Sequence, residues 1–114
     1  MNFSQYQNLS QRTAGHLNGG DPKLNLAIST LGLVGEAGEV SEIIKKHIGH
    51  GHEIDVEKVT KELGDVLWYL ANVASQLGID LEDIANLNIE KLKARYPEGF
   101  SHEASLNRPN RIQN

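Results

Sequence analysis

Two pairs of carboxylates are the most informative feature of this sequence: Glu36 with Glu39, and Glu62 with Asp65. Each pair has the spacing E-x-x-E/D, which places both members on one face of a helix. Two such helices packed face to face would bring four carboxylates together, and a bound cation is the usual remedy for their repulsion. A ligand set made only of oxygen suits Mg²⁺ or Mn²⁺ better than zinc or copper. Because acidic pairs are also common on solvated helix faces, the pattern alone leaves a metal site and a plain surface both open.

A second set of polar side chains lies nearer the C-terminus. Asn88, Lys91 and Arg95 share one face of an expected helix with apolar residues such as Leu92. Arginine can bind a phosphate through two parallel hydrogen bonds and lysine acts as a point charge, so this face could bind a phosphate group. The alternative is that both cations only extend from an apolar face into water.

Three further features border the second acidic pair or follow the first. Lys58 lies one turn before the second pair, where it could form an ordinary ion pair within the helix. Tyr69 lies one turn after that pair, and an aromatic ring there could stack on a base, whereas Trp68 is expected to pack in the core or between subunits. The segment HIGHGH over 47–52 has a metal-like composition, but its spacing fits no usual site and its glycines predict a loop.

Helices are expected to position all of these residues, because the apolar side chains recur at helical spacing. Four segments show this spacing, at about 3–15, 22–48, 55–77 and 80–96. With no strand-like alternation, the predicted class is all-α, an antiparallel bundle of about four helices per chain. The apolar arcs are wide for so short a chain, which predicts that oligomerisation completes the bundle.

The chain is expected to form one domain over residues 1–100, followed by a polar tail over 101–114 that is extended or disordered. Within the second expected helix, three glycines stand at three-residue steps: Gly32, Gly35 and Gly38. Glycine inside a helix costs about 1 kcal/mol relative to alanine. The row therefore indicates either the close approach of another element or a local break in the helix.

Composition narrows the class of protein further. The chain has 114 residues, a net charge of −4 and no cysteine. The negative charge argues against a general nucleic-acid-binding protein, and the lack of cysteine excludes a disulfide framework and thiol chemistry. No segment resembles a signal peptide and no apolar run approaches about 18 residues, so a cytoplasmic protein without membrane contact is expected.

Three segments resemble those of a known family: GLVGEAGEVSEIIKK, KVTKELGDVLWYLANVA and NIEKLKARYPEGF. They are similar to the MazG-like all-α nucleoside triphosphate pyrophosphohydrolases, which carry E-x-x-E and E-x-x-D on neighbouring helices. The resemblance covers roughly residues 3–108. It implies a hydrolase that needs Mg²⁺, for which Mn²⁺ can substitute, and that cleaves a ribo- or deoxynucleoside triphosphate between its α- and β-phosphates. The products are the nucleoside monophosphate and pyrophosphate, with cleansing of the nucleotide pool as a possible role.

The resemblance also implies which residues bind the metal. Glu36, Glu39, Glu62 and Asp65 match the acidic positions that hold metal ions in the family. Glu39 is in addition our candidate for orienting or deprotonating the attacking water, because a carboxylate not fully used as a ligand can accept a proton.

Substrate contacts are implied in the same way. Lys58, Lys91 and Arg95 match positions that contact phosphates, and Asn88 lies in the same motif. Lys91 and Arg95 would stabilise charge on the leaving pyrophosphate, and Tyr69 is our candidate for contact with the base. The resemblance further implies a homodimer or homotetramer in which helices of two subunits build each site. It does not imply which base or sugar is preferred.

Two other kinds of protein compete with this interpretation. A di-iron or di-manganese bundle uses Glu-x-x-His on two helices, and no glutamate in this sequence is followed by histidine three residues later. A non-catalytic helical interaction or regulatory module stays open as the alternative. In such a module the acidic pairs would be solvated or would bind a basic partner.

Overall fold

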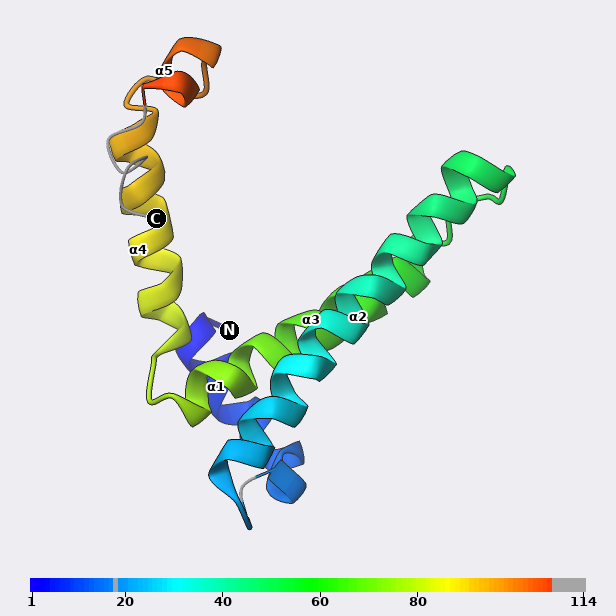
Figure 1. Ribbon diagram of the computed structural model, residues 1–114, viewed down its shortest axis with the longest axis vertical. Coiled ribbons are helices and arrows are strands. Elements are labelled where there is room, and N and C mark those ends of the chain that lie inside the picture. The colour runs from blue at the N-terminus through cyan, green and yellow to red at the C-terminus, as the bar shows by residue number, and fades with distance from the viewer. Residues whose placement is uncertain (18, 108–114) are drawn as a thin grey trace. The chain divides into compact units, whose positions relative to one another are not determined.

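The computed structural model describes residues 1–17 and 19–107, and every regular element in these ranges is helical (Figure 1). Within these ranges the α-helices are, in chain order, α1 (Phe3–Ser10), α2 (Pro22–His50), α3 (Val56–Gln76), α4 (Leu81–Arg95) and α5 (His102–Leu106). Two short 3₁₀-helices follow α1, namely η1 (Gln11–Thr13) and η2 (Gly15–Leu17). The predicted all-α class is confirmed.

Capping residues set the ends of α2 and α3 close to where the sequence predicts them. Helix α2 begins after Asp21, whose side chain accepts a 2.9 Å hydrogen bond from the backbone N–H of Lys23. It ends at Gly51, which has the left-handed conformation (φ 70°) common just past a helix C-terminus. Asp55 caps α3 in the same way and accepts a 3.1 Å bond from the backbone N–H of Lys58.

Helices α2 and α3 form an antiparallel pair whose members lie side by side (Figure 1). Ser29 of α2 is fully buried and accepts hydrogen bonds from Asn72 Nδ2 at 2.8 Å and Gln76 Nε2 at 2.6 Å. Its hydroxyl donates to the carbonyl of Asn25 at 2.9 Å. A hydroxyl has one proton and two lone pairs, so these three bonds use it fully. Because buried polar groups must keep their partners, this network fixes how the two helices are aligned.

Of the three glycines in the row along α2, one is closely packed and two are open. Helix α2 runs without a break from Pro22 to His50, so the predicted alternative of a local break does not occur. A Cβ atom on Gly32 would lie 2.2 Å from Cε1 of Tyr69, which means that the Tyr69 ring packs directly on the backbone of α2. Nothing lies within 4 Å of the corresponding position at Gly35 or Gly38. Close approach therefore explains Gly32 alone.

The N-terminal segment is held to the rest of its unit by Gln7. The Gln7 amide donates to Ser75 Oγ at 3.0 Å and to the carbonyl of Ile79 at 2.9 Å. Its Oε1 accepts a 2.8 Å bond from the backbone N–H of Leu81, at the start of α4. The short helix predicted over about 3–15 is shorter still, because α1 stops at Ser10 and the chain continues in 3₁₀ turns. The Ser10 hydroxyl donates to the Gln7 carbonyl at 2.7 Å, a local bond of the kind that competes with helix continuation.

The chain packs as two units, Met1–Leu81 and the part from Glu82 onward. In the second unit, α4 is followed by the short helix α5, which is capped by Ser101 through a 3.0 Å bond from the backbone N–H of Ala104. The prediction of an extended or disordered tail is therefore wrong for the residues of α5. The last part of that predicted tail, 108–114, lies outside the described residues.

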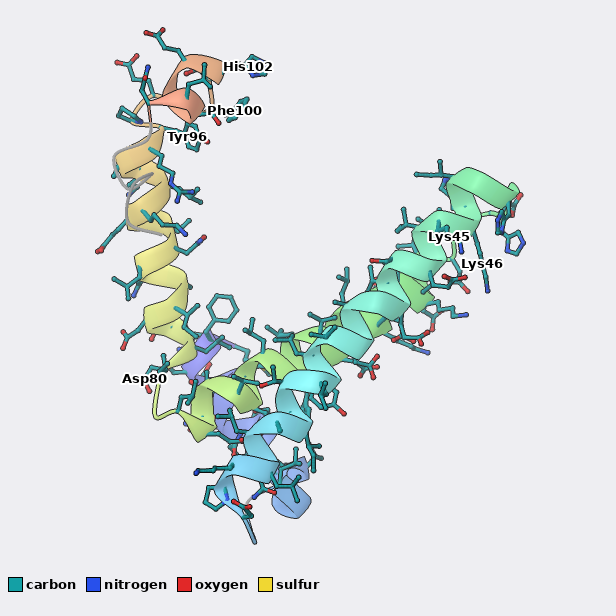
Figure 2. The ribbon with its side chains drawn as sticks, viewed as in Figure 1. Lys45, Lys46, Asp80, Tyr96, Phe100 and His102 are labelled. Carbon is teal, nitrogen blue, oxygen red and sulfur yellow. The ribbon has the colours of Figure 1, made fainter. Side chains whose placement is uncertain are left out.

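Three ring side chains cluster between α4 and α5. The Phe100 ring lies 5.3 Å from that of Tyr96 and 5.5 Å from that of His102, measured between centroids (Figure 2). These contacts connect the end of α4 to the start of α5, which explains why a helical turn forms in a polar tail.

Few large apolar side chains are buried in the described ranges, 1–17 and 19–107. The buried apolar residues are Ala14, Leu17, Ala71, Ala74 and Leu81. On α2, by contrast, Leu31 and Val34 are 71% and 66% exposed. Among the described residues, no helix combines the length and the apolar character needed to cross a membrane.

Candidate metal centre between α2 and α3

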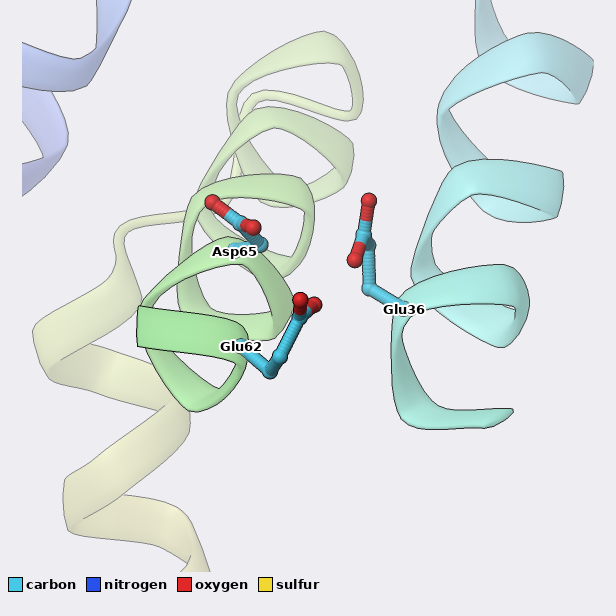
Figure 3. Close-up of side chains that lie close together, drawn as sticks. All are labelled: Glu36, Glu62 and Asp65. Atoms are coloured by element: carbon cyan, nitrogen blue, oxygen red, sulfur yellow. The ribbon is translucent and has the colours of Figure 1, made fainter. Parts of the chain in front are cut away.

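Three of the four predicted carboxylates meet between α2 and α3, and we refer to them as the carboxylate trio: Glu36 from α2, with Glu62 and Asp65 from α3 (Figure 3). One oxygen of each lies within 4.8 Å of the others. The three-residue spacing of Glu62 and Asp65 puts both on the same face of α3. Figure 3 shows the Glu36 carboxylate facing them from the neighbouring helix. Glu36 and Glu62 are half-buried and Asp65 is exposed, so solvent reaches the trio from one side.

The crowding of carboxylates in the trio raises the pKa of Glu36. The pKa of Glu36 is raised above its ordinary value of 4.5, first because its carboxyl shares a hydrogen bond with Glu62 and then because of partial burial. The negative charges of Asp65, Glu62 and Glu39 raise the pKa further. A hydrogen bond between two carboxyl groups requires a proton on one of them. A divalent cation could replace that proton and bind oxygens of all three side chains.

The donor set of the trio fits a hard divalent cation. Mg²⁺ and Mn²⁺ prefer carboxylate and water oxygens, and Mg²⁺ commonly takes one or two protein carboxylates together with waters and substrate phosphates. The solvent-exposed side of the trio would admit such additional ligands. Over the described residues, no other group of three acidic, histidine or cysteine side chains converges in this way, and the histidines of 47–52 form none.

Glu39 lies one helical turn beyond Glu36 and is not a member of the trio. Its negative charge nevertheless acts on Glu36. Glu39 lines a hollow of about 160 Å³ at the end of the helix pair, and Lys58 lines the same hollow. The fold thus brings these two predicted residues together beside the trio. Their roles toward metal, water and phosphate stay predictions.

The aromatic side chains lie on the other side of the trio. Tyr69, one turn after Asp65, packs on Gly32 and meets the ring of Trp68 edge-on at a centroid distance of 5.0 Å. Trp68 Nε1 donates a 2.8 Å hydrogen bond to Thr13 Oγ1, so Trp68 packs within the chain. Tyr69 is half-buried, and its contact with a base stays a prediction.

Tyr6 is a neighbour of the site that the residue pattern of the sequence did not predict. Burial raises the pKa of the Tyr6 phenol, and the negative charge of Asp65 raises it further. Helix α1 therefore brings a phenol close to the trio. The sequence does contain a signal that could have identified Tyr6. Its hydroxyl makes it the one residue with a polar tip in the apolar stripe formed with Phe3 and Leu9.

The remaining predicted residues lie on α4, in the other unit. Helix α4 is continuous from Leu81 to Arg95, so Asn88, Lys91 and Arg95 do share a helix face. Asn88 and Lys91 are exposed and Arg95 is half-buried. Their part in phosphate binding stays a prediction.

The fold and the site define a class, an all-α protein whose two longest described helices hold converging carboxylates. A family model described as the MazG nucleotide pyrophosphohydrolase domain matches residues 26–100, which include all of α3 and α4 and most of α2. The chain belongs to this MazG family. It is also 33% identical over 114 residues to "Gene 37 protein" of Mycobacterium phage L5. The matched region covers 95% of this chain and 100% of the relative. No solved structure matches the chain.

Proposed function

We propose that this chain is a divalent-metal-dependent hydrolase that cleaves a ribo- or deoxynucleoside triphosphate between its α- and β-phosphates. The single observation that carries the proposal is the convergence of Glu36, Glu62 and Asp65 between two packed helices. Membership of the MazG family supports a nucleotide as the substrate. Mg²⁺ is the proposed cation and Mn²⁺ its substitute, because both accept carboxylate, water and phosphate oxygens.

The residues around the trio would divide the chemistry among them. Glu36, Glu62 and Asp65 would hold the cation, which would supply positive charge near the phosphate oxygens and make water a better nucleophile. Glu39 is our candidate to orient that water or accept its proton. The water oxygen adds to the α-phosphorus, the bond to the oxygen bridging to the β-phosphate breaks, and pyrophosphate leaves with the electron pair. Lys58, which lines the same hollow as Glu39, would bind a phosphate oxygen.

The other predicted contacts complete the proposal. Asn88, Lys91 and Arg95 would hold phosphate groups from their shared face of α4, and the two cations would offset the charge on the departing pyrophosphate. Tyr69 would contact the base, because its half-buried ring lies one turn from Asp65.

We propose that the working form is a homodimer or homotetramer, with a second copy of the chain covering the apolar face of α2. Leu24, Ile28 and Leu31 recur at helical spacing along α2 and are all exposed. The open position at Gly38 continues the same helix and would allow another helix to come close. Light scattering should give a mass above that of the monomer, and Leu31→Lys should lower it. A monomer at micromolar concentration would refute this part of the proposal.

A substrate screen tests the activity directly. Purified protein is incubated with each common NTP and dNTP in Mg²⁺, in Mn²⁺ or in EDTA, and pyrophosphate and orthophosphate are measured separately. Pyrophosphate should be the first product and EDTA should abolish its release. Orthophosphate as the first product would refute cleavage between the α- and β-phosphates, and unchanged turnover in EDTA would refute the need for metal.

Substitution of the trio distinguishes an enzyme from a non-catalytic helical module. Glu36→Gln, Glu62→Gln and Asp65→Asn should each lose most activity and weaken the thermal stabilisation by Mn²⁺, while helical circular dichroism is kept. Glu57→Gln is the matched control, because Glu57 is an exposed carboxylate on α3 that pairs with Lys61 at 3.3 Å. Near-normal turnover in two or more of the trio variants would show that the site is wrongly assigned.

A further inference from the structure

The hollow beside the trio contains three basic side chains, of which only Lys58 is accounted for by the proposed function. Lys46, at the end of α2, and His52, in the turn before α3, also line it. Three carboxylates complete the charged lining: Glu39, Glu42 and Glu53. A volume of about 160 Å³ admits a small anion such as a phosphate group.

The HIGHGH segment fixes where His52 stands. The backbone N–H groups of Gly51 and His52 both donate to the carbonyl of Lys46, which ends α2. His47 Nδ1 lies 2.7 Å from the carbonyl oxygen of His52, and because that oxygen can only accept, the ring nitrogen donates. With hydrogen bonds at both its N–H and its carbonyl, the His52 backbone is held in place at the rim of the hollow. The segment thus ends a helix and aims a histidine, a role for which no metal is needed.

Lys46 is available to an anion in the hollow. Its Nζ lies 3.9 Å from Glu42 Oε1, a pair that is about half exposed and therefore weak. Glu42 has a second partner, because Lys45 Nζ lies 3.7 Å from Glu42 Oε2 on the outer side. Figure 2 shows both lysines on the last turns of α2.

The spacing along the helices relates the hollow to the trio. Glu42 lies six residues beyond Glu36, a rise of about 9 Å along α2. Lys58 lies four residues before Glu62, a rise of about 6 Å along α3 in the same direction, because the helices are antiparallel. Lys46 lies ten residues beyond Glu36, a rise of about 15 Å along α2, and its side chain leans back toward the trio because helical side chains tilt toward the helix N-terminus. Lys46 and Lys58 both line the hollow, which places them within reach of the outer phosphate of a triphosphate whose inner phosphates contact a cation at the trio.

We propose that Lys46 and His52, together with Lys58, bind the terminal phosphate of the substrate, and that they make the site prefer nucleoside triphosphates to diphosphates. This inference rests on the proposed function. A diphosphate bound at the trio has no third phosphate to enter the hollow and would be cleaved, if at all, to monophosphate and orthophosphate. A triphosphate gains contacts in the hollow, and its pyrophosphate leaves on that side with its charge offset. The in-line water would then approach the α-phosphorus from the opposite side, so Glu39, which lines the hollow, would in this arrangement help to hold the cation rather than that water.

The test compares two neighbouring lysines that share Glu42 as a partner. Lys46→Ala should lower kcat/KM for the triphosphate about tenfold, as for one charge-assisted contact, and leave kcat/KM for the diphosphate unchanged. Lys45→Ala, which loses the same charge outside the hollow, should change either value less than about twofold. His52→Gln should act like Lys46→Ala, because His52 lines the same hollow. Equal effects on triphosphate and diphosphate, or equal effects of the two lysine variants, would overturn the inference.

Calorimetry of pyrophosphate binding separates failure of this inference from failure of the proposed function. In Mg²⁺, pyrophosphate should bind the wild-type chain and Lys45→Ala alike, and Lys46→Ala about tenfold more weakly. If no nucleotide is turned over but this difference is found, the proposed activity fails and the anion site in the hollow is supported. If nucleotides are turned over but pyrophosphate binds both variants equally, the activity stands and the hollow is not the terminal-phosphate site. Absence of pyrophosphate binding to the wild-type chain would also overturn the inference that the hollow binds the terminal phosphate.

Discussion

Replacing Gly32 with alanine tests the contact that places Tyr69 beside the trio. The new Cβ would lie 2.2 to 2.6 Å from three atoms of the Tyr69 ring, so the ring or the helix must move. The ring cannot swing away freely, because it meets Trp68 edge-on. Overpacking of this kind costs about 1–3 kcal/mol. Alanine returns about 1 kcal/mol of helix propensity, which leaves a net loss of up to about 2 kcal/mol.

Two other glycines provide controls for the same substitution. Nothing lies within 4 Å of the Cβ position at Gly35 of α2 or Gly64 of α3. Gly35→Ala and Gly64→Ala should therefore each raise the free energy of unfolding by about 1 kcal/mol through propensity alone. Gly32→Ala should fall about 1–3 kcal/mol below them, or several degrees in melting temperature.

Urea unfolding at one fixed protein concentration measures these differences, because an oligomer's stability depends on concentration. A double-mutant cycle then assigns the cause. In a Tyr69→Ala background the ring is gone, so Gly32→Ala should be no worse than Gly35→Ala. If Gly32→Ala is as stable as Gly35→Ala in the wild-type background, the close packing of Tyr69 on α2 is refuted.

Three further predictions concern the buried network, the N-terminal segment and the trio. Ser29→Ala should cost about 2–4 kcal/mol in urea unfolding, because two buried donors lose their acceptor, whereas Ser41→Ala, which removes a similar but exposed bond within α2, should change stability by less than about 0.5 kcal/mol. Gln7→Ala should cost about 2–3 kcal/mol and speed hydrogen exchange at the Leu81 amide, and unchanged exchange would contradict the capping contact. Without metal, the free energy of unfolding should fall as pH rises from 4.5 through the raised pKa of Glu36, because the native state holds that proton more tightly than the unfolded state. Urea titrations in EDTA should show this fall in the wild type and lose it in Glu36→Gln.

Local sequence signals predict the helices and the trio well. Asp21 and Asp55 are caps and Gly51 is a helix end, and each acts on residues within one turn, so the bounds of α2 and α3 follow from short-range rules. The Glu62–Asp65 spacing likewise fixes a shared face without reference to the rest of the chain. Glu62 and Asp65 come close to Glu36 once α2 and α3 pack together, and the spacing of apolar residues in both helices already indicated that packing.

The features that the sequence did not predict depend on long-range contacts. Gln7 meets Leu81 across 74 residues of sequence, and no periodicity in α1 indicates that an amide will cap α4. The proximity of Tyr6 to Asp65 is likewise a contact between residues far apart in the sequence. Ser29 was missed because a buried serine looks like any surface serine until its two amide partners on α3 are known.

The order of side chains along the α2–α3 pair indicates a direction for the bound substrate. From the trio toward the turn, the hollow presents Lys58, Lys46 and His52. In the opposite direction, Tyr69 presents an aromatic ring one turn from Asp65. A molecule with an anionic tail and an aromatic base can satisfy both ends in only one orientation, with the tail toward the turn. The α–β bond of a nucleoside triphosphate would then lie at the trio, which is where the proposed cleavage requires the cation.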